Sequence, residues 1–545
     1  MRQSSRFAAA IVIAITGASA PAHRTAADQQ RPASAGPRIE IAFTRDARTE
    51  PVTGMVYVAI SRDKARPPIE QTSPTGAPLF SRFVEGLAPG EPAAITASDR
   101  GHPIRSLRDL PAGEYWMQPF VNVYTRFARA DGKTVWLHND QWEGQDWKRS
   151  PGNLIGDPVK VTFDPASIAP IRLVAARAIP PIEVPADTAM VKRIKIQSEI
   201  LTRWWGQPMF LGATVLLPNG YDAHPNVRYP VNYIQGHFSL AAPGGFGRGG
   251  EFDRLWLGER TPRFIYVTLQ HPTPYYDDSY GVNSENNGPY GDAILKELVP
   301  AIEARFRAIG QPWARLLSGG STGGWIAAAQ QVLYPDFYGG SFASCPDSVD
   351  FSYHQIVDIY KDANAYYVDK GWMKVERPSE RRPDGSIESM MKDENWFELV
   401  VGDKSRSGGQ WDIWEATYSP AGPDGYPLRI WNKETGEIDR SVAERWRKYD
   451  LRQILETNWT VLGPKVANKL NVYVGDMDSY YLNDAVERLN DFLSKADDPR
   501  FTGEIVFRRR APHCWGPGPA DLLQKMTAQI DKVAPAGADR KGWRY

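Results

Sequence analysis

Short apolar runs alternate with helical stretches from about Pro185 to the end of the chain. Seven of these runs are candidates for buried strands, at residues 213–217, 229–234, 264–269, 314–317, 340–343, 470–474 and 504–508. Residues 290–306 carry an apolar side chain at every fourth position and predict a helix. Strands that alternate with helices are typical of a mostly parallel sheet with helices on both faces. The second part of the chain is therefore expected to have an α/β fold.

Residues 37–183 have a different pattern, with strand-like runs at 39–43, 55–60, 115–124, 159–163 and 171–175. Turn residues separate these runs and helical periodicity is absent, which predicts an N-terminal β-sandwich domain. A chain of 545 residues is also too long for one ordinary core, since single cores stop growing near about 250–300 residues. Carbohydrate binding and packing against the second domain are both open as roles for the sandwich, and we favour packing.

The second domain, at 184–545, contains a segment that breaks its strand–helix alternation. Residues 346–464 are rich in aromatic and charged side chains and show no clean period. We expect this segment to be an insertion that lies over the carboxyl edge of the sheet.

The first residues have the composition of an export signal. Arg2 and Arg6 precede an apolar run at 7–15, and small residues follow as far as Ala22. We predict a signal peptide at 1–22 and a periplasmic or secreted protein. An uncleaved membrane anchor is the alternative, although the apolar run is shorter than the roughly 20 residues that a bilayer span needs. No later run of 18 apolar residues occurs, so we expect no membrane span in the mature chain.

Charge and motif content argue against several classes of function. The 64 basic and 64 acidic residues cancel, so nucleic acid is not an expected partner. No nucleotide loop, haem motif or zinc spacing occurs, and we expect no cofactor. Acidic residues near Asp484 resemble a calcium loop, but the alternate oxygen ligands and the closing glutamate are missing, so no metal is expected.

The strongest local motif is G-x-S-x-G at Gly319, Ser321 and Gly323. An apolar strand precedes it, and residues 325–333, with three consecutive alanines, predict a helix directly after it. A turn this sharp between strand and helix needs small residues on both sides of the serine, because larger side chains would collide with the sheet. The context therefore predicts that Ser321 is a nucleophile at the start of a helix, where free N–H groups favour negative charge.

A serine nucleophile needs a base to take its proton and an acid to orient that base. With this motif the order along the chain is Ser, then Asp or Glu, then His. Only His354 and His513 follow Ser321, and His354 comes before any later strand that could deliver the acid. His513 lies just after the run 504–508 and is our predicted base. The acid is expected at the end of run 470–474, where Asp478 fits better than the alternative, Asp476.

An oxyanion hole needs two backbone donors. One is expected from Thr322, the residue after the nucleophile, and the other from His237 or Phe238, in the loop that follows run 229–234. The His237 side chain could equally serve substrate contact or a structural hydrogen bond.

These motifs resemble those of a family of α/β-hydrolase esterases that includes S-formylglutathione hydrolase, feruloyl esterases, enterochelin esterases and mycolyltransferases. The resemblance covers roughly residues 190–545 and rests on the segments 287–298, 319–325, 475–483 and 513–515. It implies an α/β-hydrolase fold and ester hydrolysis. The insertion at 346–464 departs from the compact members, and we expect it to shape the acyl or alcohol pocket, so the substrate does not transfer by analogy.

Further site residues are expected on the loops around this edge of the sheet. Cys345 and Cys514 follow strands whose ends meet there, and we predict a disulfide between them. For substrate binding we select four aromatic residues: Tyr276, Tyr280, Trp325 and Trp515. Tyr275, Trp411 and Trp414 could also stack on rings or sugars, although a packed core explains such aromatics equally well.

The leading interpretation is an exported serine esterase that hydrolyses a small-molecule or carbohydrate-linked carboxylic ester through a Ser-His-Asp triad. The same triad would serve an acyltransferase, or a peptidase or amidase. A noncatalytic carbohydrate-binding surface protein is the alternative from another class. The sequence leaves the oligomeric state open.

Overall fold

The computed structural model describes residues 36–139, 146–276 and 278–544. Residues 36–545 form one compact unit, and residues 1–35 are assigned to another. The signal peptide predicted at 1–22 lies outside the described residues. Within the described part of the chain, no helix combines the length and the apolar character needed to cross a membrane.

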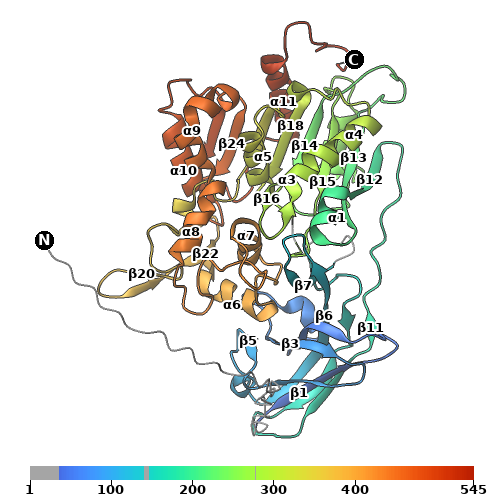
Figure 1. Ribbon diagram of the computed structural model, residues 1–545, viewed down its shortest axis with the longest axis vertical. Helices are drawn as coiled ribbons and strands as arrows, with labels where there is room; N and C mark the ends of the chain where they lie inside the picture. Colours follow the sequence, from blue (N-terminus) through green and yellow to red (C-terminus); the bar gives the residue numbers. More distant parts are fainter. Residues whose placement is uncertain (1–35, 140–145, 277, 545) are drawn as a thin grey trace, which may run out of the picture. The chain divides into compact units, whose positions relative to one another are not determined.

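A central sheet of eight strands has the order β12-β13-β15-β14-β18-β19-β24-β25 (Figure 1). In that order the strands span Val191–Ser198, Met209–Leu216, Ile265–Gln270, Val231–Gln235, Arg315–Gly320, Gly340–Ser344, Leu470–Gly475 and Glu504–Arg508. The six from β15 to β25 pair in parallel, whereas β12 and β13 are antiparallel at one edge. The predicted α/β fold is confirmed, with all seven predicted strands present at slightly shifted ends and β12 in addition.

Helices cover both faces of this sheet. On one face α5 (Thr322–Leu333) contacts β14, β18 and β19, and α9 (Leu451–Val466) packs on α5 and on α10 (Leu482–Leu493). On the other face α11 (Pro519–Val533) contacts α2 (Glu251–Leu257). There the Gln529 side-chain amide of α11 donates to the Gly339 carbonyl at 2.8 Å.

The helix predicted at 290–306 is present but not uniform. It consists of α3 (Tyr290–Ala293), a π-helical turn (Ile294–Leu298) and α4 (Val299–Arg305). Pro300, near the start of α4, has no N–H to donate, and its ring crowds the carbonyl four residues earlier. These two effects account for the wider turn that precedes α4.

Two sheets form the first part of the described chain. The smaller contains β10 (Ile171–Ala175), β1 (Arg38–Phe43) and β4 (Ala93–Thr96). The larger contains β2, β3, β5, β6, β7, β8, β9 and β11, at Val52–Ser61, Leu79–Leu87, Arg100–His102, Gly113–Ala128, Thr134–His138, Leu154–Ile155, Val159–Phe163 and Arg177–Ala178. A buried apolar cluster draws residues from both sheets. The separate sandwich domain at 37–183 stays a prediction, because residues 36–545 form a single compact unit.

The segment 346–464 contains α6 (Met391–Val401), α7 (Gln410–Tyr418), α8 (Arg440–Trp446) and all but the last two residues of α9. It also contains two hairpins, β20–β21 and β22–β23, whose strands span Tyr367–Asp369, Lys374–Glu376, Pro378–Arg381 and Ile387–Met390. Helix α6 packs against the N-terminal sheets, where the Trp396 indole N–H donates to the Gly101 carbonyl at 2.8 Å. Figure 1 shows α6 and α7 between those sheets and the central sheet.

Candidate active site

Ser321 occupies the turn between β18 and α5. Its φ of 56° lies in the positive region that residues other than glycine rarely adopt. A Cβ atom at Gly319 would lie 2.3 Å from the Gly323 carbonyl oxygen, and one at Gly323 would lie 2.1 Å from the Gln235 carbonyl oxygen. Both glycines are therefore required, because β18 and α5 pass directly against the end of β14. The strained turn presents the Ser321 hydroxyl at the carboxyl edge of the sheet.

A chain of hydrogen bonds connects Ser321, His513 and Asp478. The Ser321 Oγ lies 3.1 Å from His513 Nε2, and His513 Nδ1 lies 2.8 Å from Asp478 Oδ2. Asp478 is fully buried, and its Oδ1 accepts the backbone N–H groups of Tyr480 at 3.0 Å and Leu482 at 3.3 Å. An ionised carboxylate at Nδ1 favours the tautomer with its proton there, which leaves Nε2 to accept the serine hydroxyl. The geometry is that of a base positioned to activate a nucleophile.

The alternative acid, Asp476, is engaged elsewhere. Its Oδ1 accepts the Arg510 backbone N–H at 2.5 Å and so fixes the turn that follows β25. Asp484, the other acidic residue of this loop, accepts the Asn483 side-chain amide at 2.8 Å. Of the three carboxylates near the end of β24, Asp478 is the one that contacts the His513 ring.

Two opposing effects set the pKa of His513. Burial alone would lower this pKa, but hydrogen bonds to Asp478 and Cys514, with the negative charges of both, outweigh burial and raise the pKa to about 10. The pKa of Cys514 is in turn lowered to about 6, first by its hydrogen bond with Cys345 and then by His513. His513 and Cys514 thus each stabilise the charged form of the other.

The predicted disulfide between Cys345 and Cys514 is absent from the structure, in which both residues are free thiols. The loops do meet, because Cys345, Cys514 and His513 have side-chain ligand atoms that all lie within 4.8 Å of one another. Each sulfur already has a partner, since Cys345 Sγ accepts the Ser321 backbone N–H at 3.2 Å and Cys514 hydrogen-bonds to Cys345 and His513. Among the described residues these three form the group that could hold a metal ion.

A second carboxylate contacts the nucleophile, and the sequence did not reveal it. Asp347 is 4% exposed, and its Oδ1 lies 3.3 Å from the Ser321 Oγ. Its Oδ2 accepts the Tyr280 hydroxyl at 2.7 Å, the Thr322 hydroxyl at 3.2 Å and the Trp414 indole N–H at 3.3 Å. Burial raises the pKa of Asp347 above its usual value, although these hydrogen bonds act in the opposite direction.

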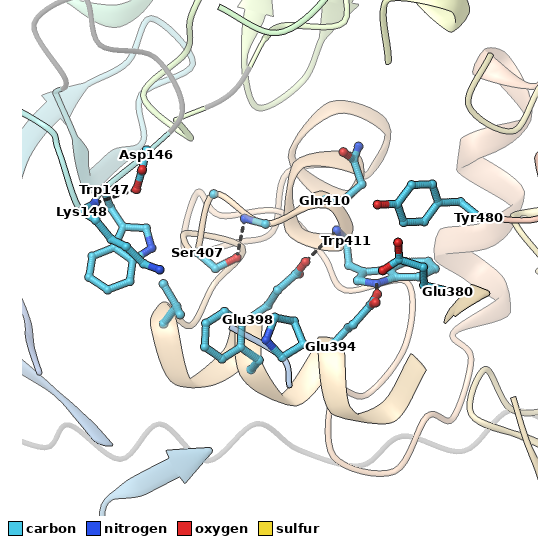
Figure 2. Close-up of a pocket in the computed structure, with 15 residues that line it drawn as sticks. Asp146, Trp147, Lys148, Glu380, Glu394, Glu398, Ser407, Gln410, Trp411 and Tyr480 are labelled. Atoms are coloured by element: carbon cyan, nitrogen blue, oxygen red, sulfur yellow. Dashed lines mark hydrogen bonds between the residues drawn. The ribbon is translucent and has the colours of Figure 1, made fainter. Parts of the chain in front are cut away.

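A cavity of about 410 Å³ opens at Ser321. Besides Ser321, the residues that line it are His237, Gly320, Asp347, Gln355, Glu394, Gln410, Trp411, Trp414, Tyr480, Leu482, His513 and Cys514. A second cavity of about 500 Å³ shares four of these residues, Glu394, Gln410, Trp411 and Tyr480 (Figure 2). The insertion at 346–464 supplies much of the wall, as expected for a segment over the carboxyl edge of the sheet.

The four aromatic residues that we selected for substrate binding do not line this cavity. Trp325 is fully buried between Tyr280 and Tyr418, and Tyr280 is a buried partner of Asp347. The Tyr276 ring is buried and stacks on His138, and Trp515 packs on the apolar core. Tyr276, Tyr280 and Trp325 thus fill the core beneath the site, and a role of the four residues in substrate binding stays a prediction. Trp411 and Trp414, which we had left open, do line the cavity.

The predicted oxyanion donors lie on either side of the nucleophile. Thr322 is the first residue of α5, where no carbonyl of that helix can accept its N–H. His237 follows β14 and Gly236, and its half-exposed side chain lines the cavity, with Nδ1 3.8 Å from Asp278 Oδ2. The choice between His237 and Phe238 as second donor stays a prediction.

No family model and no curated protein matches the chain. Among solved structures it is similar to a ferulic acid esterase, at 18% identity and a TM-score of 0.35, with 63% of this chain and 97% of that chain covered. It is similar to an S-formylglutathione hydrolase from Agrobacterium tumefaciens at 14% identity and a TM-score of 0.35, over 64% and 95% of the two chains. FphF, a fluorophosphonate-binding serine hydrolase of Staphylococcus aureus, matches at 14% identity and a TM-score of 0.36, over 62% and 98%.

The ferulic acid esterases and S-formylglutathione hydrolases among these neighbours belong to the family that the sequence motifs resemble. Their identities and TM-scores are low, so these likenesses add no argument about what the site does. The fold follows from the strand order, and the chemistry from the geometry around Ser321.

Proposed function

We propose that the chain is a serine hydrolase that cleaves a carboxylic ester through an acyl-enzyme intermediate on Ser321. The observation that carries this proposal is the hydrogen-bonded chain from Ser321 through His513 to the buried Asp478, at a cavity large enough for a small ester. Nucleophile, acid and base follow the carboxyl ends of β18, β24 and β25, parallel strands of one sheet in which β19 lies between β18 and β24. That arrangement supports acyl transfer to serine as the first chemical step.

In this step Ser321 Oγ attacks the ester carbonyl carbon while His513 Nε2 takes the hydroxyl proton. Asp478 stabilises the resulting imidazolium and keeps the ring oriented. The negative charge on the carbonyl oxygen is met by the Thr322 N–H and by an N–H of the loop after β14. When the C–O bond of the ester breaks, His513 returns its proton to the departing alcohol.

Deacylation repeats these events with water. The neutral His513 takes a proton from a water molecule, which attacks the acyl carbonyl carbon, and the bond to Ser321 Oγ then breaks. The serine oxygen recovers its proton from His513, and the carboxylic acid leaves. On the basis of residues 1–22 we also propose that the protein acts outside the cytoplasm.

The test is fluorophosphonate labelling with peptide mapping, combined with p-nitrophenyl acetate turnover by the wild type, Ser321→Ala and Ser386→Ala. Ser386, in the exposed turn of the β22–β23 hairpin, is the matched control. We expect labelling confined to Ser321, and a loss of kcat of roughly 10³-fold or more in Ser321→Ala alone. Undiminished turnover by Ser321→Ala would refute the proposal. Product analysis with an added alcohol then separates hydrolysis from acyl transfer.

A further inference from the structure

The insertion presents hydrogen-bond acceptors to the Ser321 cavity, while the Gln410 amide and the indole N–H groups of Trp411 and Trp414 on the same wall already donate to other side chains. Asp347 and Glu394 each bring a carboxylate to the wall. Gln355 also lines the cavity, is 3% exposed and has a side-chain oxygen without a hydrogen-bond partner. A buried acceptor left without a donor is unfavourable by about 1–3 kcal/mol, so this wall suits a ligand that donates hydrogen bonds or carries positive charge.

The adjoining cavity extends the same negative character. Figure 2 shows Glu380 and Glu394 beside Trp411 and Tyr480 at one end, and Lys148 at the other. Lys148 is the one Lys or Arg among the residues that line the two cavities, and its ammonium donates to the Thr72 carbonyl at 2.8 Å. Burial, together with the charges of Glu394 and Glu388, raises the pKa of Glu380. The residues that line the cavity at Ser321 thus include no Lys or Arg, and the positive charges that act on Asp347 and Glu380 there are those of the imidazoles of His513 and, for Asp347, His237.

Glu398, which also lines the second cavity, is a carboxylate of this region that has a cationic partner. Its Oε2 lies 3.3 Å from the buried ammonium of Lys433, which also binds Asp412 at 3.1 Å. Glu394 instead accepts neutral donors only, the hydroxyls of Ser379 and Ser389 and the Trp411 indole N–H at 3.0 Å. Its charge is oriented by these donors but is not neutralised by them.

The position of Asp347 makes its charge relevant to the reaction. A carboxylate 3.3 Å from the nucleophile repels the negative charge that develops on the ester carbonyl oxygen during attack. A positive charge on the substrate, placed near the same carboxylate, would offset that repulsion. Trp411, Trp414 and Tyr480 line the same cavity, and aromatic rings attract cations such as alkylammonium groups.

We infer that the ester cleaved at Ser321 carries an ammonium group, bound by the carboxylates of Asp347 and Glu394 beside the rings of Trp411 and Tyr480. This inference rests on the proposed function and specifies its substrate class. Acyl and alcohol parts of the ester both come near the wall during the reaction, so the test includes a charged version of each.

The experiment compares pairs of esters that have the same shape and differ in one charge. For the alcohol side the pair is acetylcholine and 3,3-dimethylbutyl acetate. For the acyl side it is the p-nitrophenyl esters of 4-(trimethylammonio)butyrate and 5,5-dimethylhexanoate. In at least one pair we expect kcat/KM of the wild type to be roughly tenfold or more higher for the cationic ester. Equal or better turnover of the neutral ester in both pairs would overturn the inference.

Variants test whether the preference for cationic esters depends on the carboxylates of the cavity wall. In Glu394→Gln, and less strongly in Glu380→Gln, the ratio of cationic to neutral kcat/KM should fall toward one. The control is Glu259→Gln, an exposed glutamate outside both cavities, which should keep the wild-type ratio. A ratio unchanged in Glu394→Gln, with circular dichroism showing a folded protein, would also contradict the inference.

Binding separates this inference from the proposed function. Choline and 3,3-dimethylbutanol are titrated into Ser321→Ala with tryptophan fluorescence as the readout, and choline should bind roughly tenfold or more tightly. If p-nitrophenyl acetate is hydrolysed but choline shows no advantage, the substrate class is wrong and the hydrolase stands. If choline binds preferentially but no ester is cleaved and no fluorophosphonate labels Ser321, the cation site stands and the proposed chemistry fails.

Discussion

Cys514 influences the reaction through the charge state of His513. His513 can act as a base only when it is neutral, so kcat/KM should rise as the pH increases through its pKa. Cys514 contributes to the raised pKa of about 10. Cys514→Ser removes that negative charge, and the rising limb of the pH profile should move to lower pH by about one unit or more. The measurement is kcat/KM for p-nitrophenyl acetate between pH 5 and pH 11.

The same shift is expected for Cys514→Ala, because neither replacement carries charge. A limb that stays in place, or moves to higher pH, would show that Cys514 does not hold negative charge beside His513.

Gly323 lies so close to the end of β14 that a larger side chain there should have measurable effects on stability and activity. A Cβ at this position would lie 2.1 Å from the Gln235 carbonyl oxygen, so Gly323→Ala must push α5 away from β14. We expect a loss of about 1–3 kcal/mol in the free energy of unfolding, together with a large loss of kcat as Ser321 moves. Urea titration and ester turnover measure the two effects. Gly250→Ala is the control, since no atom lies within 4 Å of its added Cβ.

The sequence predicted the site unevenly, for physical reasons. The sequence allowed a prediction of Ser321, Asp478 and His513, because motif and chain order restrict such residues to a few positions. Asp347 could not be predicted in this way, although it follows β19 by three residues. Its role depends on contacts with Ser321, Tyr280 and Trp414, which are distant in sequence or set by the fold. Trp325 was predicted to contact substrate and lies buried in the core, because a side chain's direction toward core or cavity is set by packing rather than by distance from a motif.

At the scale of elements, a buried ion cluster holds the insertion together. The ammonium of Lys433, 1% exposed, lies within 3.3 Å of Glu398 at the end of α6 and 3.1 Å of Asp412 in α7. Lys433→Met would leave these carboxylates buried without a counter-charge, and we expect a loss of about 3–5 kcal/mol in unfolding free energy. Because α6 and α7 also carry Glu394 and Trp411, ester turnover should be lost at a correspondingly lower temperature.

The control for that prediction is Lys465→Met. Lys465 pairs with Asp336 on the surface, where both side chains are well exposed, and such pairs contribute about 0–1 kcal/mol. Similar denaturation midpoints for the two variants would contradict the importance of the Lys433 cluster.

Helices and strands were predicted well where hydrophobic periodicity is strong. They were predicted poorly where contacts between distant segments determine the secondary structure. The parallel strands are short apolar runs that the sequence displays directly, and α5 is a run of small and apolar residues. The strand β12 mixes Lys192, Arg193 and Lys195 with apolar residues, because it lies at the sheet edge, and its pairing with β13 makes it a strand. The helices of the insertion lack a clean period because they are buried on several sides.

At the scale of the whole described unit, the N-terminal sheets and the catalytic part share a core. One buried cluster contains Tyr57 and Phe120 from the N-terminal sheets together with Val400 and Val401 from α6. The Tyr57 hydroxyl donates to the Val401 carbonyl, and the Ser81 hydroxyl donates to the Val400 carbonyl at 2.5 Å. Because α6 also carries Glu394 to the Ser321 cavity, loss of the N-terminal sheets would remove support from a cavity wall.

This shared core predicts cooperative unfolding. Tyr57→Phe leaves the Val401 carbonyl buried without its donor and should reduce the unfolding free energy by about 1–3 kcal/mol. If the core is common, calorimetry will show one transition whose midpoint falls as a whole, and heat inactivation of ester turnover will fall with it. The contrary outcome is two transitions, of which Tyr57→Phe lowers only the midpoint of the one that does not abolish ester turnover. That outcome would mean that the N-terminal sheets fold independently, because a contact confined to one domain cannot destabilise the other.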